Sequence, residues 1–402
     1  MVKFLGRQSI LWSICFNIWV IWGACWILVQ PLQAGWLSGY AHRKALTFGT
    51  VDGGPHTHFP VWISRTDSDI DDVCGDDGIM AYDLRFTTSD GATELDIDPI
   101  AYSEAGGEAI FKLFTSQSGW AINDGTVFYC YYGNDAAGDP DTDDGVWDAN
   151  YIFVLHFEEA AGTLYDSADG VTSHDSTAEN LSNYQQAGKL NYALEFDGAN
   201  DYVTLADNAE FTNTEVTVEL WHKNTSWTEN DYYFAWYDST SNDGIRILQY
   251  GADPNEYIRC YFRDDSDETV MTDALNIAMD TWYHYAITRD TGDDVTAYVN
   301  GVAQADVESC AGTMDSSDAL EIGQNNSSTG RVDAFIEEVR FSNSERSADW
   351  LAFQYDNANE ADNEIAWGAE QNPPSYIPKV IIIGGHGCTG LCLVIFRRRK
   401  QK

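Results

Sequence analysis

Basic residues are scarce in this sequence. The 402-residue chain has 22 lysines and arginines against 64 aspartates and glutamates, which gives a formal net charge of −42. All of the acidic residues lie between residues 35 and 378, whereas the two terminal segments hold only basic ones. Such a field repels nucleic acid and anionic lipid. We therefore expect no nucleic-acid partner for the main part of the chain.

Enzyme signatures and long helical patterns are also absent from the sequence. No P-loop, dinucleotide fingerprint or Gly-x-Ser-x-Gly elbow occurs. The one modest helix candidate is 347–355. Short β-branched and aromatic runs bounded by Gly, Asp or Asn, such as 126–132 and 257–262, predict strands throughout. The pattern predicts an all-β fold with two β-sandwich-type domains in series.

Both ends of the chain carry apolar segments of the membrane type. Residues 1–34 begin with Lys3 and Arg7 and continue with an apolar stretch, which predicts a signal peptide or an uncleaved N-terminal anchor. At the other end, 369–378 is a Pro-rich spacer and 379–402 is an apolar run closed by basic residues. This tail is either a permanent membrane anchor or a processed tag, since its order resembles the C-terminal sorting tags of bacterial surface proteins. We expect an exported, extracellular protein held at the cell surface, with membrane-type helices at both ends.

Four cysteines lie in the main part of the chain, two in each half: Cys74, Cys130, Cys260 and Cys310. An even number of cysteines outside the cell favours disulfides. One bridge in each domain is the simplest arrangement, although four cysteines allow three connectivities.

Four motifs stand out in residues 35–147: 36–44 (WLSGYAHRK), 59–61 (FPV), 83–91 (DLRFTTSDG) and 131–134 (YYGN). With them this part of the chain resembles a secreted family known as domain of unknown function 2341. The resemblance implies a small β-rich extracellular domain without established active residues.

Residues 148–368 contain five strand motifs: 194–203 (LEFDGANDYV), 218–221 (VELW), 282–286 (WYHYA), 297–301 (AYVNG) and 335–342 (FIEEVRFS). With these motifs this part of the chain resembles the laminin-G-like, concanavalin A-like lectin sandwiches. The resemblance implies a jelly-roll sandwich with a closing strand at 335–342. Glu337 stands where such strands usually have Asp.

Calcium is the ligand that the acidic residues of this domain favour. It takes six to eight oxygen ligands from carboxylates, amides and carbonyls. Asp197, Asn200 and Asp201 offer such oxygens on one turn, and Glu337 is the candidate on the closing strand. The alternative is that Asp197 and Gly198 only build a tight turn.

Sugar binding would use exposed aromatic rings. Residues 227–237 are rich in them, and Trp227, Tyr233 and Tyr237 are the candidates. Because alternate residues of a strand face opposite sides, at most half of this cluster is exposed.

A catalytic reading rests on Glu94, Asp96 and Asp98, whose alternate spacing resembles that of glycosidase carboxylates. These residues lie outside the lectin-like domain, so we favour a non-catalytic protein that binds extracellular carbohydrate or glycoprotein. A polysaccharide-active enzyme or accessory module is one alternative, and a structural envelope protein is another.

Overall fold

The computed structural model describes residues 35–374, together with 20–21, 24–25, 379–383 and 392–396, and with gaps at 71–82, 105–107, 135, 139–144, 169–171, 239, 242, 252–255, 264–268, 272–276, 313, 315 and 360–364. Cys74 and most of the predicted signal peptide lie outside these residues. Residues 1–35 and residues 36–402 form two separate compact units. The all-β prediction is confirmed: strands dominate, and α1 is the one α-helix among the described residues.

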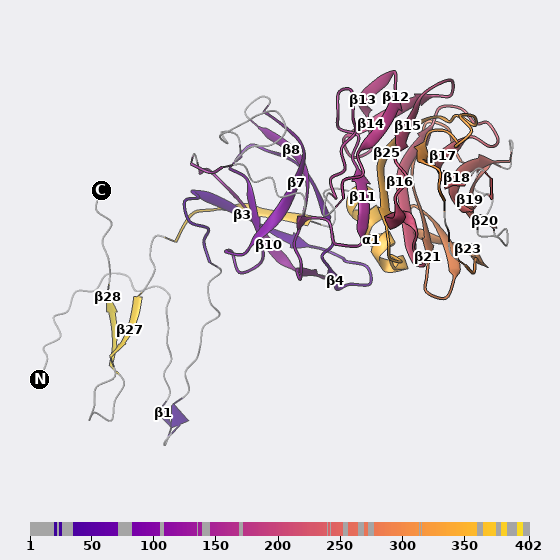
Figure 1. Cartoon of the computed structure of the whole chain (residues 1–402). Helices are drawn as coiled ribbons and strands as arrows, with labels where there is room; N and C mark the ends of the chain where they lie inside the picture. Colours follow the sequence, from indigo (N-terminus) through magenta and orange to yellow (C-terminus); the bar gives the residue numbers. More distant parts are fainter. Residues whose placement is uncertain are drawn as a thin grey trace, which may run out of the picture. The chain divides into compact units, whose positions relative to one another are not determined.

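The first domain contains a seven-stranded sheet with the spatial order β26-β3-β10-β6-β7-β8-β5 (Figure 1). Its strands are β3 His42–Phe48, β5 Val61–Asp67, β6 Arg85–Thr87, β7 Glu94–Glu104, β8 Ala109–Ser116, β10 Val127–Tyr132 and β26 Ile365–Gln371. Two short strands, β4 His56–Thr57 and β9 Ala121–Ile122, form a separate pair. β26 follows the second domain in sequence yet pairs with β3, so it extends across the predicted domain end at 368.

The second domain is built from two sheets. The first has the order β13-β14-β25-β16-β21-β22-β23, with β11 also paired to β25, and the second has the order β12-β15-β24-β17-β18-β19-β20. The strands of the first are β11 Tyr151–Leu155, β13 Asn183–Ala187, β14 Tyr192–Asp197, β16 Val216–Asn224, β21 Trp282–Arg289, β22 Asp294–Val299, β23 Val302–Ser309 and β25 Asp333–Ser342. Those of the second are β12 Ser176–Asn180, β15 Tyr202–Leu205, β17 Tyr232–Tyr237, β18 Gly244–Tyr250, β19 Tyr257–Arg263, β20 Thr269–Met271 and β24 Leu320–Ile322. One apolar cluster, which includes Phe196, Val218, Trp236 and Phe341, fills the space between them.

The central strands of the first of these sheets are buried on both faces. Almost every residue of β16 and β25 is buried, and all five residues of β11 are. Consecutive residues of a strand are all buried only when both faces of the strand are covered. Here one face meets the opposite sheet, and the other meets the first domain and α1 Ala348–Asn359.

The helix candidate and the turn at 300–301 are both found. α1 starts one residue after the predicted start and packs on the turn between β22 and β23. Asn300 and Gly301 have φ of 51° and 75°, which is the left-handed region that Asn and Gly tolerate best. A side chain at Gly301 would also collide with Ala352 of α1.

The terminal segments differ from the expected helices. Their described parts are two short antiparallel pairs: β1 Val20–Ile21 with β2 Ala24–Cys25, and β27 Lys379–Ile383 with β28 Cys392–Phe396. Consecutive β-branched residues such as Ile381, Ile382 and Ile383 favour strands, which explains the difference in the C-terminal pair. Among the helices of the described residues, none has the length and apolar character needed to cross a membrane.

Candidate functional site

One outward face of the lectin-like sandwich is covered. Trp221 of β16 stacks on Tyr355 of α1 with ring centroids 5.7 Å apart, and Gln354 of α1 donates a hydrogen bond to Glu219 of β16. Tyr298 of β22 shares an apolar cluster with residues of the first domain. The outward side of this sheet is therefore a domain seam.

The outward side of the other sheet carries alternating tyrosines and arginines. On β19, Ile258, Cys260 and Phe262 belong to the core, so the residues between them point outward and are half-buried. On β18, Ile245 and Ile247 belong to the same core, so Arg246 and Tyr250 lie on the outer side, where Arg246 is buried and Tyr250 is half-buried. We define the tyrosine–arginine face as Tyr232, Arg246, Tyr250, Tyr257, Arg259 and Tyr261.

The guanidinium groups of this face lie on tyrosine rings. The carbon at the centre of the Arg246 guanidinium is 4.4 Å from the ring centroid of Tyr237 and 4.7 Å from that of Tyr261, its cross-strand partner. That of Arg259 is 3.0 Å from the Tyr250 centroid, and Arg259 donates a hydrogen bond to the Tyr261 hydroxyl at 3.2 Å. Stacking of this kind orders both partners into a flat platform.

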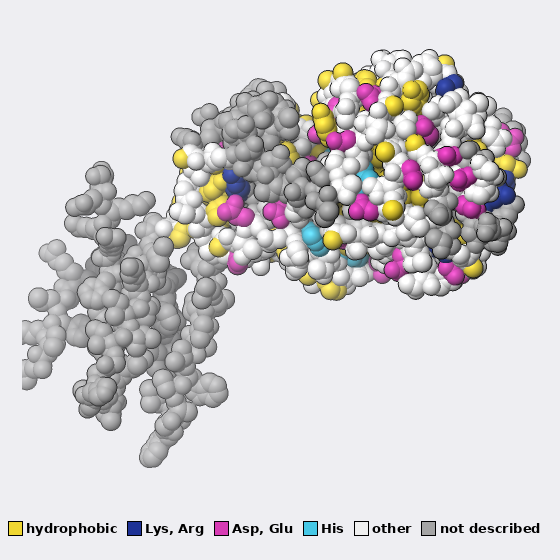
Figure 2. Space-filling model, in the orientation of Figure 1, with side chains coloured by type: hydrophobic (Ala, Val, Ile, Leu, Met, Phe, Trp, Pro, Cys, Tyr) yellow, Lys and Arg dark blue, Asp and Glu magenta, His cyan; other side chains and the backbone are white. Residues whose placement is uncertain are grey.

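Burial sets the charge states on the face. Burial raises the pKa of Tyr232 and of Tyr237, so both hydroxyls stay neutral donors at neutral pH. Burial also lowers the pKa of Arg246, although an arginine keeps its charge in proteins. Figure 2 shows that dark-blue basic side chains are few beside the magenta acidic ones.

The sugar-binding aromatics predicted from the sequence are mostly buried. Tyr233 is fully buried, and its hydroxyl is held by Asn224 and Gln249, so its ring cannot stack on a sugar. Tyr237 is buried beneath Arg246, and Trp227 packs partly against the core with its indole N–H donating to Gly251. The error has a local cause: a register shift between Tyr232 and Phe234 turns two successive side chains inward.

The alternating tyrosines and arginine lie on a different strand, β19. The sequence predicts a strand at 257–262 and a disulfide at Cys260. Tyrosine or arginine stands at every second position of this strand. That spacing places Tyr257, Arg259 and Tyr261 on one side of β19.

Three of the four predicted calcium ligands lie on one turn, where the backbone N–H of Asp197 donates to Asp201 Oδ2 at 3.3 Å and the side-chain amide of Asn200 lies 3.5 Å from Asp201 Oδ1, whereas Glu337 lies further along the sheet. Asp197 uses its carboxylate to accept hydrogen bonds from the backbone of Ala199 and Asn200, as a tight turn requires. Asp201 is buried against Ser182. Glu337 accepts hydrogen bonds from the backbone N–H groups of residues 189–191. Asp197 pairs across the strands with Asp333, and Glu337 lies four residues further along β25. Within the described ranges, no group of three or more His, Cys, Asp or Glu side chains is arranged to hold a metal ion.

The predicted disulfides are wrong for the cysteines that the structure describes. Cys130, Cys260 and Cys310 are buried thiols. The Cys260 sulfur lies 2.9 Å from the Tyr285 hydroxyl inside the sandwich core. An apolar core accepts cysteine as a small hydrophobic residue, so an even number of cysteines did not require bridges.

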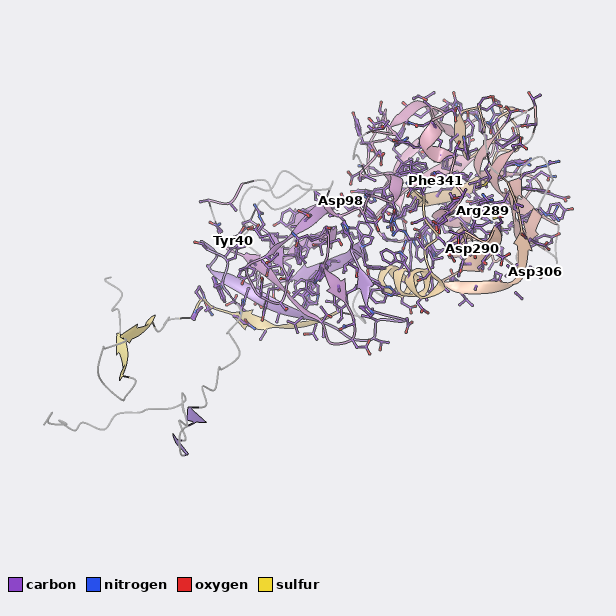
Figure 3. All side chains as sticks on the ribbon, turned by 60° about the horizontal axis from the view of Figure 1, so that its bottom comes forward. Tyr40, Asp98, Arg289, Asp290, Asp306 and Phe341 are labelled. Carbon is purple, nitrogen blue, oxygen red and sulfur yellow. The ribbon has the colours of Figure 1, made fainter. Side chains whose placement is uncertain are left out.

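The alternate carboxylates of β7 divide among different roles. Glu94 lies beside Arg85, whereas Asp98 is buried at the domain seam, where it faces His156 Nε2 at 2.9 Å and accepts a hydrogen bond from Trp147 Nε1 at 2.7 Å (Figure 3 labels Asp98). Glu338 contacts the other nitrogen of His156, so the histidine joins a carboxylate from each domain. These buried ion pairs connect the domains and do not form an open pair of catalytic acids.

This geometry defines a β-sandwich with one covered sheet and one sheet that presents stacked tyrosines and arginines. Residues 197–352 match the family model described as the concanavalin A-like lectin/glucanases superfamily, which supports the predicted lectin-like domain. The assignment of residues 35–147 to the domain of unknown function 2341 stays a prediction. Comparison with curated proteins gives no match.

Several solved structures are similar to part of the chain. The botulinum neurotoxin type G receptor-binding domain is 15% identical with a TM-score of 0.39 and covers 52% of this chain and 51% of its own. The binding domain of paraclostridial mosquitocidal protein 1 is 16% identical with a TM-score of 0.40 and covers 51% of this chain and 52% of its own. The ligand-binding domain of botulinum neurotoxin serotype D, in complex with N-acetylneuraminic acid, is 14% identical with a TM-score of 0.41. The chain spans about half the length of these structures.

Proposed function

We propose that this protein binds extracellular carbohydrate without catalysis, through the tyrosine–arginine face of its second domain. We further propose that it is exported and held at the cell surface, as the basic and apolar character of its terminal segments favours. The observation that carries the binding proposal is the alternation on β19, which places Tyr257, Arg259 and Tyr261 half-buried on one outward surface, beside Tyr250 of β18.

Each group on the face suits a sugar. A tyrosine ring offers an apolar surface that packs on the C–H face of a pyranose, and its hydroxyl adds a polar contact. The guanidinium groups of Arg246 and Arg259 supply donors for ring and hydroxyl oxygens. Because these side chains are already stacked, little side-chain entropy is lost when a ligand binds.

An acceptor lies in the same row of the sheet. Ala235 pairs with Arg246 on one side and with Glu321 of β24 on the other, so the three residues form a row across neighbouring strands. Glu321 accepts hydrogen bonds from Thr204 and Gln324, which fix its carboxylate. The small side chain of Ala235 separates a donor from an acceptor, an arrangement that suits a sugar bearing both kinds of group.

The experiment is a glycan array followed by calorimetry on the best ligand. Tyr250→Ala and Tyr261→Ala should each weaken binding roughly tenfold, since loss of one stacked ring costs about 1 kcal/mol or more. Tyr165→Ala is the matched control, because Tyr165 is a 62% exposed tyrosine of the same domain outside the face. Equal binding by the face variants and the wild type would refute the proposal.

The same material separates the alternatives. Release of products from a polysaccharide panel would support an enzyme, and an empty array would support a structural envelope protein. Repeating the titration with a calcium chelator tests the predicted calcium dependence.

A further inference from the structure

A cleft of about 730 Å³ lies at the seam between the two domains. Its walls come from both: His58, Asp96 and Gln117 from the first, and Asp148, Glu210 and Asn213 from the second. The volume lies within the range of small-molecule sites, which occur preferentially at domain interfaces. The tyrosine–arginine face contributes no residue to it.

The cleft lining is polar and acidic. Among the described residues that line it are three carboxylates, from Asp96, Asp148 and Glu210, and no lysine or arginine. Asp148 is bound in bidentate fashion by Arg346, at 2.7 and 2.8 Å. Asp96 and Glu210 add further negative charge from opposite domains, and the net charge of the chain adds to the same field.

Glu210 is positioned by a buried histidine. Its Oε2 lies 3.2 Å from Nε2 of His174, and the Nδ1 of His174 lies 3.4 Å from Asp166, although neither contact is aligned as a hydrogen bond. Thr172 donates to Oε1 of Glu210. The Glu210 side chain is 47% exposed, so it is contacted by the protein yet accessible to a ligand.

The first-domain wall is also specifically shaped. His58 has a φ of 58°, an uncommon value for a residue other than glycine, and its Nε2 lies 2.9 Å from the carbonyl oxygen of Gly145. A side chain at residue 145 would overlap the Asp96 carboxylate, so glycine allows Asp96 to lie against the backbone there. Strained residues of this kind gather at ligand sites.

The cleft also contains a polar group that lacks a partner. Tyr151 is 5% exposed and lines the cleft, and its hydroxyl has no hydrogen-bond partner among the described residues. A buried hydroxyl without a partner costs about 1–3 kcal/mol. A ligand with hydroxyl groups could supply the missing bond.

We propose that this cleft is a second binding site, for a small polyhydroxylated cation such as a short amino sugar. Its protonated amine binds between Asp96 and Glu210, and its hydroxyl groups meet the amide and hydroxyl side chains of the lining. Carboxylates from both domains attract a cation, and the described lining residues include no lysine or arginine.

The test is calorimetry of the full chain with the glucosamine disaccharide, at a pH where its amines are protonated. The N-acetylated disaccharide serves as the neutral comparison. We expect one site, with binding at least tenfold weaker for Glu210→Gln, for Asp96→Asn and for the acetylated sugar. Asp306→Asn is the matched control, since Asp306 is an exposed carboxylate on β23 and its loss changes the net charge equally.

The outcomes are distinct. Non-specific attraction to an acidic chain would give equal binding by the Asp306→Asn and Glu210→Gln variants, and this result would overturn the proposal. Failure of the wild type to bind the amino sugar at millimolar concentration would also overturn it. Melting temperatures show whether each variant is folded, and Asp96→Asn gives a second reading if Glu210→Gln is not. Tyr261→Ala should leave this binding unchanged, so failure of the cleft and failure of the tyrosine–arginine face are separable.

Discussion

Replacing Asp98 by alanine should lower the free energy of unfolding by about 3–5 kcal/mol. Asp98 is 3% exposed, and its Oδ2 accepts a hydrogen bond from Trp147 and faces His156 across the domain seam. Alanine leaves both donors buried without an acceptor, and each costs about 1–3 kcal/mol. It also removes one of the two carboxylates that balance the charge of His156, leaving Glu338 alone.

Urea unfolding followed by tryptophan fluorescence measures this loss. Asp98→Asn keeps an oxygen acceptor for Trp147 and should fall between the alanine variant and the wild type. Asp306→Asn, on the exposed strand β23, should stay within about 0.5 kcal/mol of the wild type. If Asp98→Ala loses less than about 1 kcal/mol, the buried ion pairs contribute little to domain docking and the reasoning fails.

Three further predictions concern the buried titratable groups, strand β26 and the cysteines. The free energy of unfolding should fall as the pH rises from about 5 to about 8. Burial raises the pKa of Glu158 and of Glu337 to about 8. Burial lowers the pKa of His156, but the carboxylates of Glu338 and Asp98 outweigh it and hold this pKa well above 6.5. Both effects favour the protonated forms in the folded state, so denaturation curves that are flat or rise with pH would contradict them. Ending the chain at residue 364 removes β26 from the edge of β3 and should lower the melting temperature of the first domain by several degrees, read from proteolysis on heating. A reductant should leave the melting temperature unchanged, since Cys130, Cys260 and Cys310 are thiols, and a drop would reveal a disulfide.

The sequence was sufficient for the fold class because its signals are local. Short runs with period two, turn residues between them and the single helix at the end depend only on neighbours along the chain. The return of β26 to the first sheet depends on a contact between residues more than 300 positions apart, since Ile365 pairs with Phe48. No local pattern reports such a pairing, so residues 369–371, at the end of this strand, were read as part of a spacer.

The candidate site was harder to predict because one irregularity decides which side chains face outward. Strict alternation through β17 would place Tyr233 opposite Phe234, but the register shift buries both. A bulge of this kind leaves no clear mark in a run of aromatic residues. Strand β19, on the far side of β18, pairs with β18 without a register shift, and there alternation assigns the outward residues correctly.

Several charged residues in the strands of this chain are buried, unlike the charged residues on its surface. Glu219, Glu337, Glu338 and Arg340 would be read as solvent-facing in an isolated sandwich, yet each is buried because the first domain and α1 cover their sheet. Removing such charges from water is costly unless partners are supplied, and the partners here include His156 and the backbone of residues 189–191. An apolar seam would tolerate sliding, whereas charges that must meet these partners allow one docked arrangement. We therefore expect the seam to hold the cleft walls in register, so that substitution of Asp98 should weaken ligand binding in the cleft along with stability.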